Sequence, residues 1–320
     1  MHNGLGSLLG DRDLFHQAWE ESDHRCARAM RELAKSYQRE KNWVKVIQCM
    51  QKALDLNSLR QNDWFLLGHA AQQTENFKLG CDAFLRVLQI NPEASQAWAN
   101  LGACHACLKK YKQACYALGE AVKLRPKNWK MWANLRTFAA DAGNWYEVIR
   151  SSEQLITIYK KKGKEALRGA FDPYTAMLLI KHVIACNDDV QMKHLREQAS
   201  KFISRVCNTL PTSPIIWGIA STFYKGMKNE KKEMECKLLQ CRALQIPRWN
   251  KDVRKFEMLA GACLQLAEKY EKHGSSASLY SGYMFLKSIV KGSEELFREN
   301  GLHAQLVRTM NKLRDSFESM

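Results

Sequence analysis

Three cysteines near the middle of the chain, Cys104, Cys107 and Cys115, are the first candidates for a chemical site. Cys104 and Cys107 have the spacing of a zinc-ligand pair, and His105 lies between them. A structural zinc site needs four ligands, however, and no second Cys-X-X-Cys pair completes the set. Proteins bury free cysteine more often than most residues. We therefore expect buried thiols between packed helices, and we predict no metal and no cofactor.

Other reactive patterns are incomplete. Gly4 and Gly6 resemble the start of a dinucleotide fingerprint, but no strand precedes them and the third glycine falls one residue late. Asp188 and Asp189 have no His or Lys of catalytic type beside them, and we expect a turn there. The sequence contains no P-loop Gly-Lys-Ser/Thr and no His-Glu-X-X-His. We predict that the chain is not an enzyme, because no set of residues meets even the residue-type requirement of a catalytic site.

The elements that position these residues repeat with a period of 34 residues, which is typical of a helical solenoid. Four units follow one another without a gap, at 27–60, 61–94, 95–128 and 129–162. Three columns carry large side chains at the fourth, seventh and seventeenth positions of each unit: Met30, Trp64, Trp98 and Trp132; Leu33, Leu67, Leu101 and Leu135; Trp43, Phe77, Tyr111 and Trp145.

The columns predict an all-α fold in which each unit is a helix–turn–helix. The fourth and seventh residues share one face of the first helix, and the small eighth residue lets the second helix approach. Pro92 and Pro126 end second helices. The tryptophans of these columns are therefore expected in the core rather than stacked on bases, while the environments of Trp129, Trp217 and Trp249 stay open.

The period defines three parts of the chain. We expect a flexible leader at 1–10, regular repeats with a preceding half-repeat at 11–162, and degenerate helical repeats with a C-terminal cap at 163–320. In the last part, helices are expected near 174–186, 192–209, 251–272, 279–299 and 301–316. Between the second and third of these helices we expect one degenerate repeat. Its first helix carries Trp217 and Tyr224, and its second helix closes at Pro247.

The half-repeat at the N-terminal edge predicts how that edge of the array is covered. Asp11 is a plausible N-cap of a helix that ends at Glu21, and this helix would leave Phe15 or Trp19 exposed at the outer edge of the array. We therefore expect the chain to be the C-terminal part of a longer protein. The alternative is a leader that folds back and completes the cap.

The column residues carry a family resemblance. Trp64, Leu67, Gly68, Gly80, Phe84 and Pro92, repeated as Trp98, Leu101, Gly102, Ala114, Ala121 and Pro126, closely resemble the tetratricopeptide signature. The segment from Ala18 to Tyr37 and the Trp129–Trp132 stretch are similar to the C-terminal region of the tetratricopeptide repeat protein 27 family. The resemblance implies a tetratricopeptide-type α-solenoid that binds protein partners inside eukaryotic cells and supports assembly of a macromolecular complex.

The resemblance also implies where a partner binds. In such arrays ligands lie along the first helices, at the second, fifth, ninth and twelfth positions of each unit. We therefore expect a groove that is cationic at one end and floored by alanine at the other, suited to an acidic peptide. Its candidate residues are Arg28, Arg31, Lys35, Asn62, Phe65, His69, Gln96, Asn100 and Lys130.

Some relatives clamp the C-terminal carboxylate of heat-shock chaperones with five residues. Framed on the second to fourth units, the corresponding residues here are Phe65, His69, Asn100, Lys130 and Asn134. Only Asn100 and Lys130 match the residues that the clamp requires. The sequence therefore does not support a chaperone-tail clamp.

Charge and cysteine content set the last expectations. The formal charge is +16, of which residues 101–250 contribute +14. An RNA-associated basic scaffold is therefore the alternative to a protein-binding one, and a solvated surface is the simplest reading of the charge. Eleven scattered cysteines and the lack of an Asn-X-Ser/Thr acceptor favour a reducing cytoplasmic or nuclear setting. No apolar stretch approaches the length of a membrane span, and we expect no membrane partner.

Overall fold

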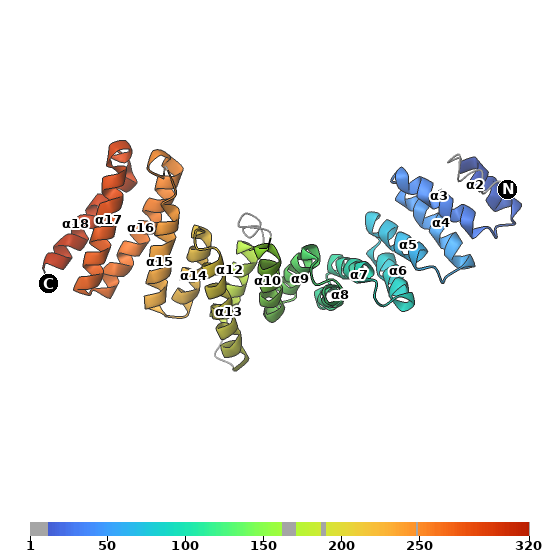
Figure 1. Ribbon diagram of the computed structural model, residues 1–320, viewed down its shortest axis with the longest axis horizontal. Coiled ribbons are helices and arrows are strands. Elements are labelled where there is room, and N and C mark those ends of the chain that lie inside the picture. Colours follow the sequence, from blue (N-terminus) through green and yellow to red (C-terminus); the bar gives the residue numbers. More distant parts are fainter. Residues whose placement is uncertain (1–11, 162–170, 187–189, 248, 320) are drawn as a thin grey trace. The chain divides into compact units, whose positions relative to one another are not determined.

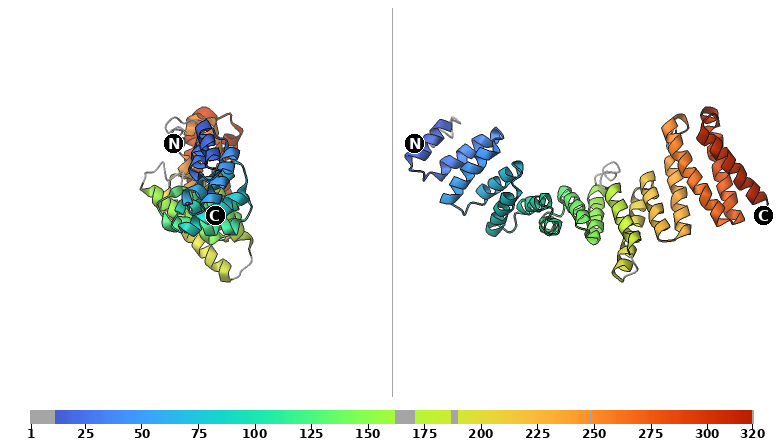
Figure 2. Two further views of the ribbon diagram at one scale, coloured as in Figure 1. Left: turned by 90° about the vertical axis from the view of Figure 1, so that its right-hand side faces the viewer. Right: turned by 180° about the vertical axis from the view of Figure 1, so that it is seen from behind.

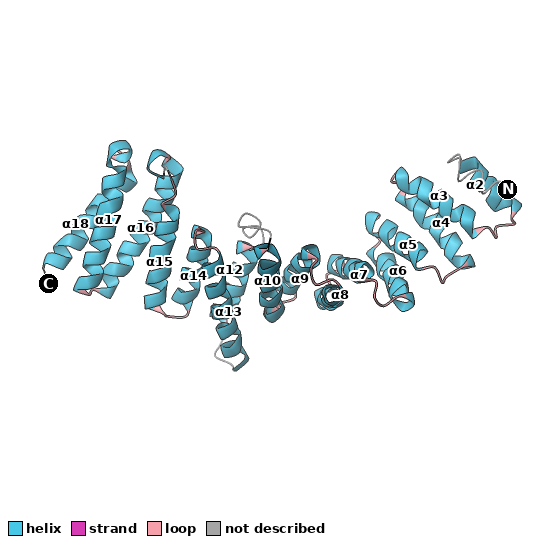
Figure 3. Cartoon of the chain, viewed as in Figure 1, coloured by secondary structure: helices cyan, strands magenta, loops and turns pink. Residues whose placement is uncertain are grey.

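The computed structural model describes residues 12–161, 171–186, 190–247 and 249–319, and every regular element in these ranges is helical (Figures 1 and 3). The chain divides into two compact units, 1–163 and 164–320, which are described separately below. The predicted leader, the glycines at 4 and 6, the N-cap at 11, residues 162–170 and the two aspartates at 188 and 189 lie outside the described residues.

The first unit is a series of antiparallel helix pairs. Its first helices begin at residues 27, 61, 95 and 129 and its second helices at 43, 77, 111 and 145, so the spacing of 34 residues is kept throughout. Each helix packs on the next one in the chain. The helices are α2 (Arg12–Glu21), α3 (Ala27–Arg39), α4 (Trp43–Leu56), α5 (Gln61–Gln73), α6 (Phe77–Ile90), α7 (Ser95–Cys107), α8 (Tyr111–Leu124), α9 (Trp129–Asp141) and α10 (Trp145–Lys160).

The turn inside each helix pair has the same hydrogen-bond pattern. After α3, the Lys41 amide donates to the carbonyl of Gln38 and the Asn42 amide donates to the carbonyl of Tyr37. This pair of bonds is a Schellman motif, which needs a left-handed residue directly after the helix. Lys41 supplies it with φ 58°, and the Asn42 side chain then caps α4 by accepting from the Lys45 amide. The equivalent left-handed residues in the next three repeats are Glu75, Lys109 and Gly143.

The small residues at the eighth position bring paired helices together. A Cβ atom added at Gly68 would lie 2.8 Å from the Phe84 ring, and one added at Gly102 would lie 3.0 Å from Leu118. Both of these partners are fully buried. The pattern of small and large residues therefore sets the helix separation, because the ring of the second helix occupies the space that a side chain would take.

The tryptophan column is less buried than expected. Trp132 is buried, but Trp64 and Trp98 are half-buried at the edge of the core, as are Trp43 and Trp145. Each of the three fourth-position indoles, whether buried or half-buried, makes a hydrogen bond to the preceding loop. The Nε1–H group donates over 2.8 Å to the carbonyl six residues earlier, from Trp64 to Ser58, from Trp98 to Pro92 and from Trp132 to Pro126.

Helix α2 closes the described N-terminal edge differently from the expectation. Phe15 and Trp19 are 3% and 7% exposed, because they join one hydrophobic cluster with Leu33 and Met50 of the first repeat. The outward side chains of α2 include His16, Gln17 and Glu20, which are exposed. The prediction of an exposed Phe15 or Trp19 is therefore wrong: the apolar stripe faces the first repeat and the polar stripe faces outward.

The second unit continues with helix pairs. It contains α12 (Pro173–Ala185), α13 (Val190–Thr209), α14 (Pro214–Gly226) and α15 (Glu230–Leu244), close to the predicted boundaries. The pair α14–α15 is a tetratricopeptide-like hairpin in detail. Its Trp217 indole donates to the Pro211 carbonyl over 2.7 Å, Lys228 is left-handed, and the Asn229 side chain caps α15. The degenerate repeat predicted around Trp217 is therefore present.

Three long helices end the chain: α16 (Val253–His273), α17 (Ser276–Phe297) and α18 (Gly301–Glu318), preceded by the short 3-10 helix η1 (Trp249–Lys251). Helix α18 packs on both α16 and α17, and the three lie side by side in Figure 1 and in the right panel of Figure 2. The Phe256 and Phe297 rings stack in their core at 4.3 Å. Only one stripe of α18 is buried, including Leu306 and Leu313, so its outer face is polar as predicted for a cap.

Candidate functional site

The first helices of the four repeats carry a solvent-accessible stripe along the first unit. It comprises the second, fifth, ninth and twelfth residues of each repeat, and among these described positions none is buried. The third and seventh residues of the same helices are all buried, so each helix turns one stripe to the core and another to solvent. We call this stripe the helix-A face: Arg28, Arg31, Lys35, Gln38, Asn62, Phe65, His69, Gln72, Gln96, Ala99, Ala103, Ala106, Lys130, Ala133, Thr137 and Ala140.

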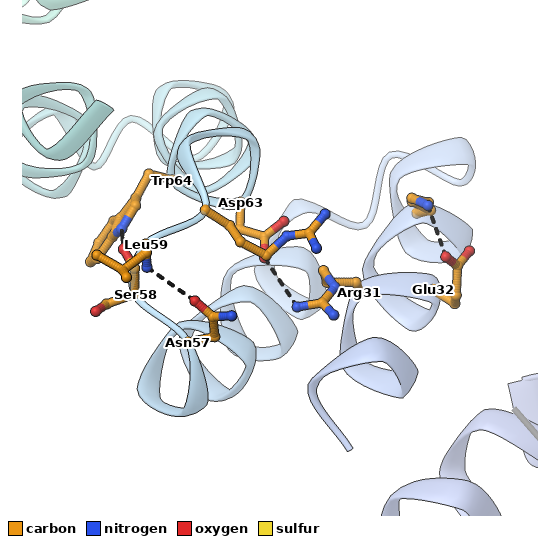
Figure 4. Close-up of polar contacts among 9 residues, drawn as sticks. Arg31, Glu32, Asn57, Ser58, Leu59, Asp63 and Trp64 are labelled. Carbon is orange, nitrogen blue, oxygen red and sulfur yellow. Dashed lines mark hydrogen bonds and ion pairs between the residues drawn. The ribbon is translucent and has the colours of Figure 1, made fainter. Parts of the chain in front are cut away.

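The cations of the first repeat have different environments. Arg28 is exposed, and Lys35 is exposed while it pairs with Glu32 over 2.8 Å. Arg31 is turned toward the second repeat, where its guanidinium lies 3.4 Å from the carboxylate of Asp63 (Figure 4). Arg60 approaches the same carboxylate at 3.5 Å. Arg31 is therefore a bridge between repeats, whereas Arg28 and Lys35 are exposed to solvent.

In the second repeat, two ring side chains of the helix-A face pack against other aromatic rings. Phe65 meets Phe84 edge-on at 5.6 Å, and His69 meets Trp43 edge-on at 5.3 Å. Both side chains are half-buried, whereas Asn62 at the start of the helix is exposed. This part of the face is a firm aromatic floor, because each ring on it is packed against a ring of a second helix.

The third and fourth repeats form the flatter part. Ala99, Ala103 and Ala106 are half-buried along α7, and Gln96 and Lys130 are exposed at the helix starts. Asn100 is half-buried, and its main-chain carbonyl accepts a hydrogen bond from the Gln72 side chain over 3.2 Å. This bond joins the second and third repeats. The alanine side chains are short, so this part of the face carries no large side chains at these positions.

Comparison with known proteins agrees with this geometry. The family model described as Tetratricopeptide repeat matches residues 95–128, which is the third repeat over its whole length. The third repeat is therefore a tetratricopeptide repeat. The predicted tetratricopeptide-type α-solenoid is confirmed by that match together with the 34-residue helix pairs.

The resemblance to the tetratricopeptide repeat protein 27 family is also confirmed. A tetratricopeptide repeat protein 27 homolog of Dictyostelium discoideum is 30% identical over 319 residues, which cover 98% of this chain and 36% of that protein. A TPR repeat-containing protein of Schizosaccharomyces pombe is 27% identical over 286 residues, which cover 87% of this chain and 34% of that protein. The chain thus spans about a third of the length of both relatives.

Among solved structures, a crystal structure of MamA has a TM-score of 0.45 at 16% identity, and it covers 50% of this chain and 95% of that one. No helix in the described part of this chain is both long and apolar enough to cross a membrane.

The structure shows the surroundings of the residues at the chaperone-clamp positions. Phe65 places a ring, packed on Phe84, where the clamp requires an ammonium group. His69 packs on Trp43 where the clamp requires an asparagine. Asn100 and Lys130 occupy matching positions, but the Asn134 side chain stands where an arginine is required.

The cysteines of the third repeat point in different directions. Cys104 is fully buried, Cys115 is half-buried and Cys107 is exposed. The prediction of buried thiols thus holds for Cys104 and is wrong for Cys107, because residues three apart at the end of α7 fall on the core edge and on the outer side. Among the described residues no group of three or more His, Cys, Asp or Glu side chains is placed to hold a metal ion.

Cys104 has another cysteine as its neighbour. Its thiol contacts Cys81 of α6, which also lies 3.6 Å from the His105 ring. The hydrogen bond with Cys81 and burial both raise the pKa of Cys104, while the same bond lowers the pKa of Cys81. The Cys81–Cys104 contact joins the second and third repeats. Sequence reasoning missed it because the two residues are not periodic equivalents.

Proposed function

We propose that this chain is a non-catalytic scaffold that binds an extended or helical acidic segment of a partner protein along the helix-A face. Tetratricopeptide arrays generally act as protein-interaction scaffolds, because stacked helix pairs create a long continuous surface. The observation that carries the proposal for this chain is the helix-A face itself, whose side chains stay accessible in every one of the four repeats.

The charge distribution on the face supports an acidic ligand. Arg28 and Lys35 are exposed on one helix, seven residues apart and thus about two turns along the same side. A guanidinium and an ammonium on one side suit carboxylates that recur along a peptide. Lys130 adds an exposed cation at the other end of the stripe.

The floor supports an amphipathic ligand. Phe65 and His69 are held by rings behind them, and Ala99 and Ala103 follow with short side chains. A preformed surface lowers the ordering cost of binding. A ligand with acidic residues on one side and apolar residues on the other would match both parts. We propose that such binding holds the partner during assembly of a larger complex.

The test uses site-specific photo-crosslinking in cell lysate. A benzoylphenylalanine at Ala103 reports on the helix-A face, and one at Gln113, exposed on α8, is the matched control. We expect Ala103 to crosslink one dominant set of proteins through acidic peptides, located by mass spectrometry. The double variant Arg28→Glu/Lys35→Glu should lose at least about 90% of that product. Equal crosslinking from Gln113, or undiminished crosslinking by the double variant, would place the binding surface elsewhere.

Arg31 is left unchanged in this test because it pairs with Asp63. Reversal of Arg31 would set two carboxylates against each other at a repeat boundary, and a loss of binding would then report on stability. The double variant avoids this, and a thermal melt by circular dichroism checks that it folds as the wild type does.

A further inference from the structure

The region where the third repeat meets the fourth has an unusual surface. The loop between α8 and α9 contributes Arg125 and Lys127, and α9 begins with Trp129 and Lys130. The end of α10 contributes Lys160 and Lys161. The Trp129 and Tyr159 rings meet edge-on at 5.7 Å, so the start of α9 and the end of α10 lie together. We call these residues the loop-side surface: Arg125, Lys127, Trp129, Lys130, Tyr159, Lys160 and Lys161.

Among the described residues, no carboxylate forms an ion pair with the cations of the loop-side surface. Residues 121–140 and 154–161 contain no Asp or Glu. Its five cations are all exposed. Lys123, one turn away, differs because it pairs with Glu120 over 2.6 Å. Five unpaired cations within one region repel each other, and the binding of an anion relieves that repulsion.

The repeat fold does not require this arrangement. Trp129 occupies the first position of its repeat, where the other repeats have Ala27, Gln61 and Ser95. The corresponding loops at 57–60 and 91–94 carry a single arginine and a single glutamate, respectively. Neither the tryptophan nor the cations are therefore needed to build a repeat boundary. The Trp129 indole is 37% exposed among these cations.

The geometry of the aromatic pair fits the stacking of an unpaired base. Tyr159 supports the Trp129 ring edge-on from behind, and the Lys130 ammonium lies 6.0 Å from the ring centroid. Single-strand binding sites combine such a ring with cations that follow the phosphates, and they need little sequence preference. A duplex hides its bases in the stack and would leave the indole unused.

We infer that the loop-side surface binds single-stranded RNA, with Trp129 stacked on a base and the five cations on the flanking phosphates. The loop-side surface shares Lys130 with the end of the helix-A face, and its other six residues lie outside that face. A short strand suffices, since about 4 nucleotides span a single aromatic platform with its flanking phosphates.

The experiment measures fluorescence anisotropy of the whole chain with a fluorescein-labelled oligouridine RNA of about 12 nucleotides. The triple variant Lys127→Glu/Lys130→Glu/Lys160→Glu should weaken binding at least about tenfold. It should also make the slope of log K against log salt concentration shallower by about 2, because each lost phosphate contact removes about 0.7 from that slope. The matched control is Lys109→Glu/Lys110→Glu/Lys112→Glu, which changes the same charge at exposed positions in the turn after α7 and the first turn of α8. We expect it to weaken binding by less than about threefold.

Variants of Trp129 distinguish base stacking from electrostatic attraction alone. Trp129→Ala should weaken binding at least about fivefold, whereas Trp129→Phe should retain most of it, because both effects follow the loss or retention of a stacking ring. Circular dichroism melts check folding of each variant, and Arg28→Glu/Lys35→Glu should bind the RNA as the wild type does, which separates this test from that of the scaffold.

Three results would overturn the inference. One is an equal loss of RNA binding in the two triple variants, and another is unchanged binding by Trp129→Ala. The third is binding to vesicles that contain phosphatidylserine with no binding to the RNA, which would assign the surface to a membrane headgroup instead.

Discussion

The guanidinium of Arg31 lies 3.4 Å from the carboxylate of Asp63, across the boundary between the first and second repeats. Asp63 is only 6% exposed, and Arg60 is its second partner at 3.5 Å. A buried carboxylate is costly unless it is paired. This three-residue cluster therefore joins neighbouring repeats at the cationic end of the helix-A face, and it removes Arg31 from the cations that a ligand can use.

Removal of Arg31 should destabilise the first unit more than removal of Arg60. Arg31 is 18% exposed and Arg60 is 50% exposed, so solvent screens the second pair more. We expect Arg31→Ala to lower the free energy of unfolding by about 1–2 kcal/mol and Arg60→Ala by less than about 1 kcal/mol. Urea unfolding of both single variants and the double variant measures this. The double variant should lose more than the sum of the two, since it leaves Asp63 without a cation; simple additivity would contradict the shared carboxylate.

Gly68 and Gly119 should respond to alanine in opposite directions. A Cβ at Gly68 lies 2.8 Å from the Phe84 ring, so Gly68→Ala must push a fully buried ring and should cost about 1–3 kcal/mol. Gly119 lies within α8 with nothing inside 4 Å of its Cβ position. Gly119→Ala should therefore stabilise by up to about 1 kcal/mol through helix propensity. Thermal melts of the two variants test this, and a Gly68→Ala variant that melts at or above the wild-type temperature would show that helix separation does not depend on the eighth position.

Substitutions at the left-handed position after the first helix should change stability in opposite directions in the third and fourth repeats. Lys109 has φ 58° and Gly143 has φ 69° at equivalent positions of successive repeats. A side chain in this conformation costs about 1–2 kcal/mol, and glycine avoids that cost. After the larger entropy loss of glycine on folding is included, Lys109→Gly should stabilise by about 0.5–1 kcal/mol. Gly143→Ala should destabilise by about 1 kcal/mol. Chemical unfolding measures both, and a destabilising Lys109→Gly would mean that the Lys109 side chain makes a compensating contact.

Two buried thiols of the second unit predict a loss of stability at alkaline pH. Burial raises the pKa of Cys207 to about 12 and that of Cys236 to about 11, from an ordinary value of 9.0. Below pH 9 both thiols are neutral in the folded and unfolded chain, and their contribution is fully present. Between pH 9 and the folded-state values the unfolded chain releases protons that the folded chain retains, so stability falls as pH rises.

The measurement is the free energy of unfolding from pH 8 to pH 10.5 in the presence of reductant. The variant Cys207→Ser/Cys236→Ser should show a shallower alkaline decline than the wild type, because serine does not ionise in this range. Cys107→Ser is the control, since Cys107 is exposed. Parallel pH profiles for the wild type and the Cys207/Cys236 variant would refute the assignment of the decline to these thiols.

The sequence alone determined the repeat architecture. The period of 34 placed the first residues of the helices at Ala27, Gln61, Ser95 and Trp129, and the structure begins its helices at these residues. Such periodicity is readable because it reflects local geometry: the same residue types return to the same helix face in each unit. The positions of the helix-A face were implied by the family resemblance, and whether a partner binds there stays a prediction.

Contacts between non-equivalent positions were decided only by the tertiary structure. Arg31 meets Asp63 because the fifth residue of one first helix lies beside the third residue of the next, and neither column shows a charge pattern in the other repeats. Phe15 and Trp19 are buried because α2 turns its apolar stripe toward the first repeat. The indoles of Trp64 and Trp98 donate to loop carbonyls six residues earlier. Hydrophobic patterning predicts that such side chains pack, but the partner of each polar atom depends on how neighbouring helices are rotated and spaced, and that is a property of the folded chain.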